Sequence, residues 1–254
     1  MDKFLYIAMS GAKQNLNSVA LQANNLANAK TIGFKEDLSQ ARSMQAFGEG
    51  HPSRVFSMTE RPGQNMSGGT LVTTGRDLDI AIQGPGWLAV EDNLGQEAYT
   101  RAGNLQVTVE GLLTTASGQP VMGDAGPIIL PVPVDKIEIG QDGSIVVRPQ
   151  GAPANFLEDV DRIKLVKPES DFELEKGNDG LFRSKQEDAF GQRLAYPAAA
   201  DVQIVKGALE SSNVNAVGSM VEMVSLQRQF EMQVKLMKQA QTIDQQSDTL
   251  MRVF

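Results

Sequence analysis

The sequence predicts an α+β protein in which terminal helices flank a central all-β region. Apolar residues follow a heptad-like spacing near the amino end, a second helical pattern runs from Met223 toward the carboxyl end, and runs of period two fill the middle. We expect the terminal segments 1–34 and 213–254 to pair as a coiled-coil-like inner domain. Residues 71–195 are expected to form an antiparallel, sandwich- or barrel-like outer domain.

A narrow apolar seam marks the first helix, which is expected over residues 3–28. Its members are spaced alternately by four and three residues: Leu5, Met9, Ala12, Leu16, Val19, Ala23 and Leu26. Such a seam is narrower than the face that a globular helix usually buries, so it favours another helix as its partner. Asn28 ends the predicted helix, and Gly33 supplies the conformational freedom of a turn.

Residues 35–70 are expected to be irregular. The stretch is polar and is interrupted by Gly48, Pro52 and Pro62. It is therefore either an extended arm or a linker that becomes ordered on binding. A second connecting arm is expected over residues 196–212.

The β domain opens with a strand, a turn and a second strand. Residues 77–83 alternate between polar and apolar, which places Asp77 and Asp79 on the solvent side, and Gly84 and Gly86 turn the chain toward Trp87. Further short apolar runs are cut by turn residues at 105–109, 137–139, 145–147, 162–166 and 180–182. Between two of these runs, a DG pair at positions 142–143 has the composition of a hairpin tip.

The second helix has a less regular seam. It passes through Met223, Leu226, Phe230, Val234, Met237, Ile243 and Leu250. Polar residues between positions 211 and 219 are candidate caps, the last being Ser219, with Glu222 three residues on. Val221, Val224 and Leu236 lie off the seam, so one partner helix would leave part of this apolar surface exposed.

The two seams are therefore the candidate assembly interface. A helix that is apolar on more than one side needs several neighbours, which favours burial between molecules. A bundle within one chain remains the alternative, because core packing explains each apolar residue as well.

Composition excludes several classes of function. The net charge of −8, with no basic run, argues against nucleic-acid binding. No apolar stretch is long enough for a membrane span, and the first residues lack the features of a cleaved signal peptide. The chain has no cysteine and a single histidine, His51, in a glycine-rich loop, so disulfides, thiolate chemistry and a histidine-based triad are not expected.

No catalytic, cofactor or metal site is expected. Asp77 and Asp79 could pair as the carboxylates of a glycosidase, but their alternation with apolar residues predicts a solvated sheet face. The rival to an assembly role is a secreted β-sandwich enzyme or carbohydrate-binding module. That reading requires a cleft with convergent carboxylates around Asp77, Asp79 or Asp142.

Three motifs resemble the axial proteins of the bacterial flagellum, the rod and hook family. They are Asn24, Asn25, Leu26, Ala27 and Asn28 followed by Gly33 and Phe34; Leu78, Asp79, Gly84 and Gly86 in the first β turn; and Asn213 and Asn215 before the second helix. They occur in the family's order and span nearly the whole chain. The short β domain and the two ends are most similar to subunits of the proximal rod, with subunits of the distal rod as the near alternative.

The resemblance implies a structural subunit of the flagellar basal-body rod. Such a subunit would be exported by the flagellar type III apparatus without a cleaved signal, and would stack in the periplasm with copies of itself and with other rod proteins. It would polymerise through its terminal helices and transmit torque. A chain without disulfides is compatible with export in an unfolded state.

Overall fold

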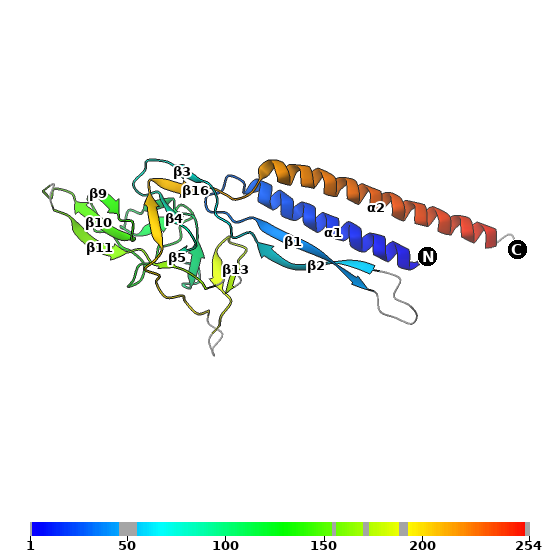
Figure 1. Ribbon diagram of the computed structural model, residues 1–254, viewed down its shortest axis with the longest axis horizontal. Coiled ribbons are helices and arrows are strands. Elements are labelled where there is room, and N and C mark those ends of the chain that lie inside the picture. Colours follow the sequence, from blue (N-terminus) through cyan, green and yellow to red (C-terminus); the bar gives the residue numbers. More distant parts are fainter. Residues whose placement is uncertain (1, 46–54, 154–155, 170–172, 188–192, 252–254) are drawn as a thin grey trace. The chain divides into compact units, whose positions relative to one another are not determined.

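The computed structural model describes residues 2–45, 55–153, 156–169, 173–187 and 193–251, and the chain divides into two compact units (Figure 1). The helical unit comprises residues 1–29, 36–65 and 214–254, and the β unit comprises residues 30–35 and 66–213. The coarse prediction of terminal helices around a central antiparallel region is confirmed. No helix in the described ranges has the length and apolar character needed to cross a membrane.

The helical unit is built on two antiparallel helices, α1 (Asp2–Ala27) and α2 (Ala216–Met251), which run side by side (Figure 1). Gln22 Nε2 donates to Glu222 Oε2 at 2.9 Å, and Gly11 lies against the side-chain amide of Gln233. The step from Gly11 to Gln22 equals the step from Glu222 to Gln233, so one register holds along the pair. Because α2 has 36 residues and α1 has 26, the last turns of α2 extend beyond α1.

Asn215 caps α2. Its Oδ1 accepts from Gly218 N at 3.1 Å, and its carbonyl accepts from Ser219 N at 2.9 Å. Asn215 is one of the polar residues between positions 211 and 219 that were expected to cap the helix, whereas Ser219, the last of them, is buried inside the helix. Both residues carry good capping side chains, and only the packing of the first turn decides between them.

A long hairpin replaces the irregular arm that was expected over residues 35–70. Strands β1 (Asp37–Gln45) and β2 (Val55–Gln64) pair antiparallel, and both pack on α1. Two isolated strands are marginal in water, so this hairpin depends on the helix beneath it. The polar sequence of the hairpin does not reveal that a helix supports it. The tip of the hairpin, with His51, lies outside the described residues.

Asn25 joins α1 to the start of β1. Its side chain is fully buried, its Nδ2 donates to Asp37 O at 2.8 Å, and its Oδ1 accepts from Asp37 N at 3.0 Å. A paired amide therefore replaces the two hydrogen bonds that a neighbouring strand would give to Asp37. This contact gives the asparagine-rich motif a structural role.

We expect Asn25→Ala to destabilise the helical unit by about 1–3 kcal/mol, because the amide and carbonyl of Asp37 would lose their buried partners. Urea unfolding followed by circular dichroism measures the loss, and hydrogen exchange should quicken at the Asp37 amide. Asn17→Ala, on the exposed side of the same helix, is the matched control. Equal stability of the two variants would contradict this role of Asn25.

The β unit consists of small antiparallel sheets, and the described strands form no closed barrel. The largest sheet has the order β12 (Leu165–Val166), β5 (Trp87–Glu91), β6 (Glu97–Thr100), β14 (Phe182–Ser184) and β13 (Leu174–Lys176). A second sheet has the order β11 (Glu158–Arg162), β10 (Ser144–Pro149) and β9 (Val134–Ile139). Three pairs complete the unit: β3 (Leu71–Thr73) with β16 (Ala208–Glu210), β4 (Ile80–Gln83) with β15 (Gln203–Lys206), and β7 (Leu105–Val107) with β8 (Leu113–Thr115).

Both faces of β4 are covered, which corrects one detail of the predicted alternation. Asp77 is exposed as expected, but Asp79 is only 4% exposed and its Oδ2 accepts from Thr74 Oγ1 at 2.7 Å. Ala81, next on the same side, is also buried. The main core packs on one face, and the strand lies too deep in the unit for the other to meet solvent.

The DG pair lies at the expected hairpin tip, between β9 and β10. Asp142 Oδ1 accepts from the backbone and the hydroxyl of Ser144, and Gly143 has a φ of +89°, which favours glycine. Local turn chemistry was therefore sufficient to locate this hairpin.

Candidate assembly surface and the Glu210 cluster

The predicted seam of α1 is split between two faces of the helix. Ala12 is buried and Leu5, Val19 and Leu26 are half-buried, on the side toward α2. The remaining three members, Met9, Leu16 and Ala23, are exposed. The positions one residue before them, Ala8, Asn15 and Gln22, face α2 in their place.

Relative to the predicted seam, α1 is therefore rotated about its axis, and this rotation buries the more polar of two possible seams. Asn15 Nδ2, Gln22 Oε1 and Gln233 Oε1 have no hydrogen-bond partner among the described residues. A buried amide without a partner costs about 1–3 kcal/mol, whereas burial of a leucine or methionine contributes about 1.5–3 kcal/mol. A helix pair without the hairpin would be more stable with the opposite rotation of α1, but the contact of Asn25 with β1 holds α1 in the observed rotation.

The predicted seam of α2 faces α1 over most of its length. Met223, Leu226, Phe230, Val234 and Met237 are all half-buried. Ile243 is 53% exposed, at the point where α1 ends beside it. The side chain of Leu250 lies outside the described part of the structure.

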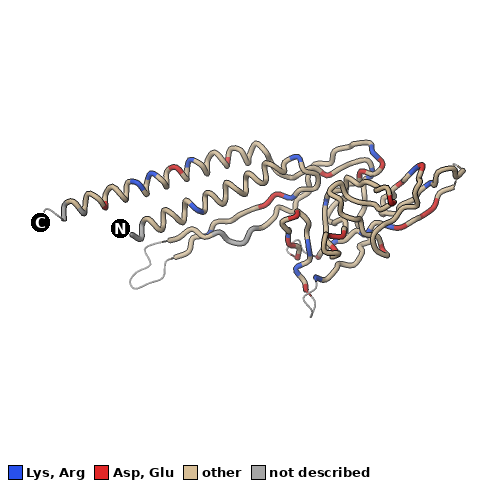
Figure 2. Tube along the Cα trace, turned by 180° about the vertical axis from the view of Figure 1, so that it is seen from behind, with Lys and Arg blue, Asp and Glu red and all other residues tan. Residues whose placement is uncertain are grey.

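The opposite side of α2 is also apolar. Val217, Val221 and Val224 are 71%, 67% and 49% exposed, and their spacing of four and three residues places them on one stripe. Met232 and Leu236 continue this surface toward the carboxyl end. Figure 2 shows both helices as mostly uncharged.

Two apolar stripes of the helical unit are therefore left open to solvent. The outer stripe of α1 consists of Met9, Leu16 and Ala23, and the outer stripe of α2 consists of Val217, Val221, Val224, Met232 and Leu236. Contiguous exposed apolar surface of this kind marks an interaction site. Its shape is suited to further helices.

A buried ionic cluster in the β unit contacts Gly33 and Gly84, which belong to two of the family-like motifs, and we call it the Glu210 cluster: Glu210, Lys35 and Arg101. Lys35 Nζ lies 2.7 Å from Glu210 Oε1, and Arg101 Nη1 lies 2.9 Å from Glu210 Oε2. All three side chains are at most 6% exposed. Arg101 also donates to Gly84 O at 2.8 Å and lies over the ring of Trp87.

Glu210 is held in its ionised form. Burial alone would raise its pKa, but the hydrogen bond from Lys35 and the charge of Arg101 outweigh burial, so the pKa lies below the ordinary value of 4.5. The carboxylate also accepts from Gly69 N at 2.9 Å. The carboxylate of the cluster is therefore satisfied.

Two glycines, Gly33 of the first motif and Gly69, allow the backbone to close around this cluster. Gly33 has a φ of +68°, and a Cβ atom there would lie 2.3 Å from the carbonyl carbon of Arg101. A Cβ atom on Gly69 would lie 1.9 Å from Ser211 O. Neither position admits a side chain without movement of the backbone.

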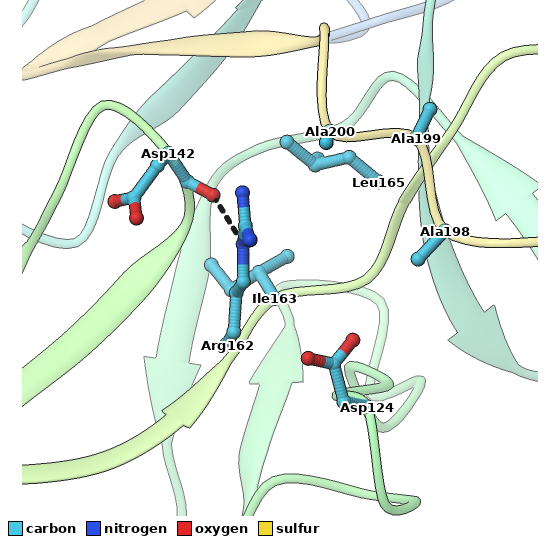
Figure 3. Close-up of a pocket in the computed structure, with 8 residues that line it drawn as sticks. All are labelled: Asp124, Asp142, Arg162, Ile163, Leu165, Ala198, Ala199 and Ala200. Atoms are coloured by element: carbon cyan, nitrogen blue, oxygen red, sulfur yellow. Dashed lines mark hydrogen bonds between the residues drawn. The ribbon is translucent and has the colours of Figure 1, made fainter.

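The enzyme alternative needs convergent carboxylates, and its three candidates have separate surroundings. Asp77 is exposed, while Asp79 is buried beside Thr74. Asp142 borders a small pocket of about 190 Å³, but its carboxylate points away from that pocket, toward its own turn, and only its carbonyl meets Arg162 (Figure 3). Hydrogen bonds from Ser144 lower the pKa of Asp142, so it is a turn carboxylate and not a proton donor.

The described residues contain no group of three side chains suited to hold a metal ion. The Figure 3 pocket is lined by Asp124, Asp142, Arg162, Ile163, Leu165 and three alanines. Nothing in its lining pairs an acid with a base or a nucleophile.

Comparison with known proteins places each part of the chain in one group. Residues 5–35 match the model described as "Flagella basal body rod protein", residues 81–147 match "Flagellar hook protein FlgE/F/G D1 domain", and residues 205–250 match "Flagellar basal body rod FlgEFG protein C-terminal". The chain is 42% identical to the flagellar basal-body rod protein FlgF of Escherichia coli K12, over 93% of each chain. It is 35% identical to FlgF of Caulobacter vibrioides over 93% of each, and 29% identical to FlgG of Bacillus subtilis over 99% of this chain.

Proposed function

Because this chain belongs to the flagellar basal-body rod protein family, it is a structural subunit and not an enzyme, and we propose that it occupies the proximal rod and polymerises through its terminal helices. The observation that carries the proposal is the rotation of α1. It leaves Met9 and Leu16 exposed while Asn15 is buried. A subunit that works as a monomer would be more stable if it buried these apolar residues within its own fold.

The outer stripes of α1 and α2 contact helices of neighbouring subunits in this proposal. Interfaces that do not close on themselves build open helical assemblies, and a rod requires such contacts. The other subunits are copies of this chain and other rod proteins. Packed helices then transmit torque along the rod, as the wider family's role requires.

Export precedes assembly in the proposed sequence of events. The chain passes unfolded through the flagellar type III apparatus, without a cleaved signal, and assembles in the periplasm. The polar seam between α1 and α2 supports this order, because unpaired buried amides keep the helix pair weak before it is covered. The absence of cysteines also leaves no disulfide to form during passage.

Complementation tests the proximal assignment. Expressed in Escherichia coli that lacks its own FlgF, the chain should restore swimming at least in part, because 42% identity extends over both helical ends. The same chain should fail in a strain that lacks FlgG. Rescue of the strain without FlgG alone would favour the distal rod, and soluble protein in the cytoplasm of both strains would count against export.

A further inference from the structure

We propose that the Glu210 cluster is a clamp that carries mechanical load, which joins the chain segments that lead out of the β unit and fixes them to its core. The proposal rests on the proposed rod function only for the source of the load. The clamp itself is a property of the β unit, and it can be measured on a single subunit.

Every covalent connection to the helical unit leaves the β unit through one of three short segments. The chain crosses between the units at 29/30, 35/36, 65/66 and 213/214. These crossings delimit segment 30–35 and lie at the ends of the segments 66–70 and 208–213. Any force carried along the chain from the helical unit therefore enters the β unit through these segments.

Glu210 ties the three segments to one another. Its carboxylate accepts from Lys35 Nζ at 2.7 Å and from Gly69 N at 2.9 Å, and its carbonyl accepts from Gly33 N at 2.8 Å. Lys35 Nζ also donates to Ser67 O at 2.8 Å, which links the first segment directly to the second. One residue of the third segment thus holds both of the others.

Arg101 connects the tied segments to the core. It follows strand β6, its Nη1 donates to Glu210 Oε2 at 2.9 Å, and its Nη2 donates to Gly84 O at 2.8 Å. Its guanidinium lies 5.3 Å from the ring centre of Trp87 in β5. Trp87 belongs to a buried cluster with Phe182. A continuous path therefore runs from the exit segments into the five-stranded sheet.

Stability alone is a weak reason for a buried ion pair. Apolar residues of similar volume usually stabilise a folded protein as well or better. Charge-assisted hydrogen bonds are short and directional, however, and water cannot replace them at a site that is at most 6% exposed. These properties suit a joint that must resist being pulled apart.

Single-molecule stretching of the full-length chain tests the clamp. The native chain has no cysteine, so Val217→Cys and Leu94→Cys provide two unique attachment points. Both side chains are exposed, Val217 by 71% just past the 213/214 crossing and Leu94 by 82% in the turn between β5 and β6. The force between them runs through Glu210 and Arg101.

Arg101→Lys is the informative variant in this background, because Arg101 lies on the path of the force. It keeps the charge but loses the bond to Gly84, so the rupture force of the first event should fall by roughly half. Lys35→Met, which removes the bonds of Lys35 to Glu210 and Ser67 but leaves Glu210 and Arg101 as a balanced pair, should lower the rupture force less and is the second variant if the first does not fold. Val121→Ala, a cavity variant in the main core, is the control for lost stability.

The clamp would be refuted if the cluster variants lowered the rupture force no more than Val121→Ala does for the same loss of unfolding free energy. The measurement requires no assembly. A failure of complementation would therefore leave it interpretable, and a failure of the clamp would leave the rod assignment intact.

Discussion

Glu210→Ala is expected to destabilise the β unit by about 3–5 kcal/mol, because it removes the carboxylate that the buried cations Lys35 and Arg101 share. The same substitution frees the amide of Gly69, which has Glu210 as its acceptor. The loss is large against the usual stability of a domain, about 5–15 kcal/mol. Chemical denaturation measures it, with the fluorescence of Trp87, the single tryptophan, as the probe.

The pH dependence of the unfolding free energy separates the effect of the charge of Glu210 from the effect of its shape. Since the pKa of Glu210 is lower in the folded protein than its ordinary value of 4.5, the carboxylate stabilises the fold at neutral pH and loses this effect as the pH falls below 4.5. Glu210→Gln cannot titrate. The difference in unfolding free energy between it and the wild type should therefore shrink below pH 4.5, and a difference that stays constant would contradict an ionised Glu210.

Glu175→Ala is a suitable control for both measurements. Glu175 belongs to the same unit, but its side chain is 55% exposed, and it pairs with Arg193 at a distance of 3.7 Å between a guanidinium nitrogen and a carboxylate oxygen. Surface pairs of this kind contribute about 0–1 kcal/mol. A similar loss in both variants would show that burial of the Glu210 cluster is energetically unimportant.

Periodicity and turn chemistry predicted the features that depend on neighbours in sequence. The two helices and the Asp142 hairpin could be located in this way, because spacing of apolar residues and a DG pair are local signals. The Glu210 cluster could not, since Lys35 and Glu210 are separated by 175 positions. Each residue was close to a motif, but a single sequence does not say which charges pair.

The rotation of α1 could not be predicted from the sequence for a related reason. The sequence contains two overlapping seams, which share Leu5, Ala12, Val19 and Leu26, and hydrophobicity favours the one with Met9 and Leu16. The hairpin decides against it by holding Asn25, and the hairpin was itself hidden in a polar segment. The assembly interface that was predicted from the seam therefore remains a prediction, now restricted to the residues that the rotation leaves exposed.

Leu16→Asp should abolish assembly while the subunit itself keeps its stability. Leu16 is 52% exposed on the outer stripe of α1, so water solvates the new carboxylate in the free subunit. A neighbouring helix that covers the stripe would bury this charge, at a cost of about 3–5 kcal/mol, or more than roughly 100-fold in affinity. Complementation of swimming and recovery of basal bodies measure assembly, and thermal unfolding by circular dichroism measures the subunit.

Asn17→Asp separates the stripe from a general effect of charge on α1. It introduces the same carboxylate one position later, at another exposed site off the stripe, and should assemble normally. Phe230→Asp cannot serve this purpose, because Phe230 is half-buried against α1 and its loss would break the pair within one subunit. If Leu16→Asp assembled as well as Asn17→Asp, the outer stripe of α1 would not be an interface. The exposed valines of α2 would then have to carry the contacts between subunits.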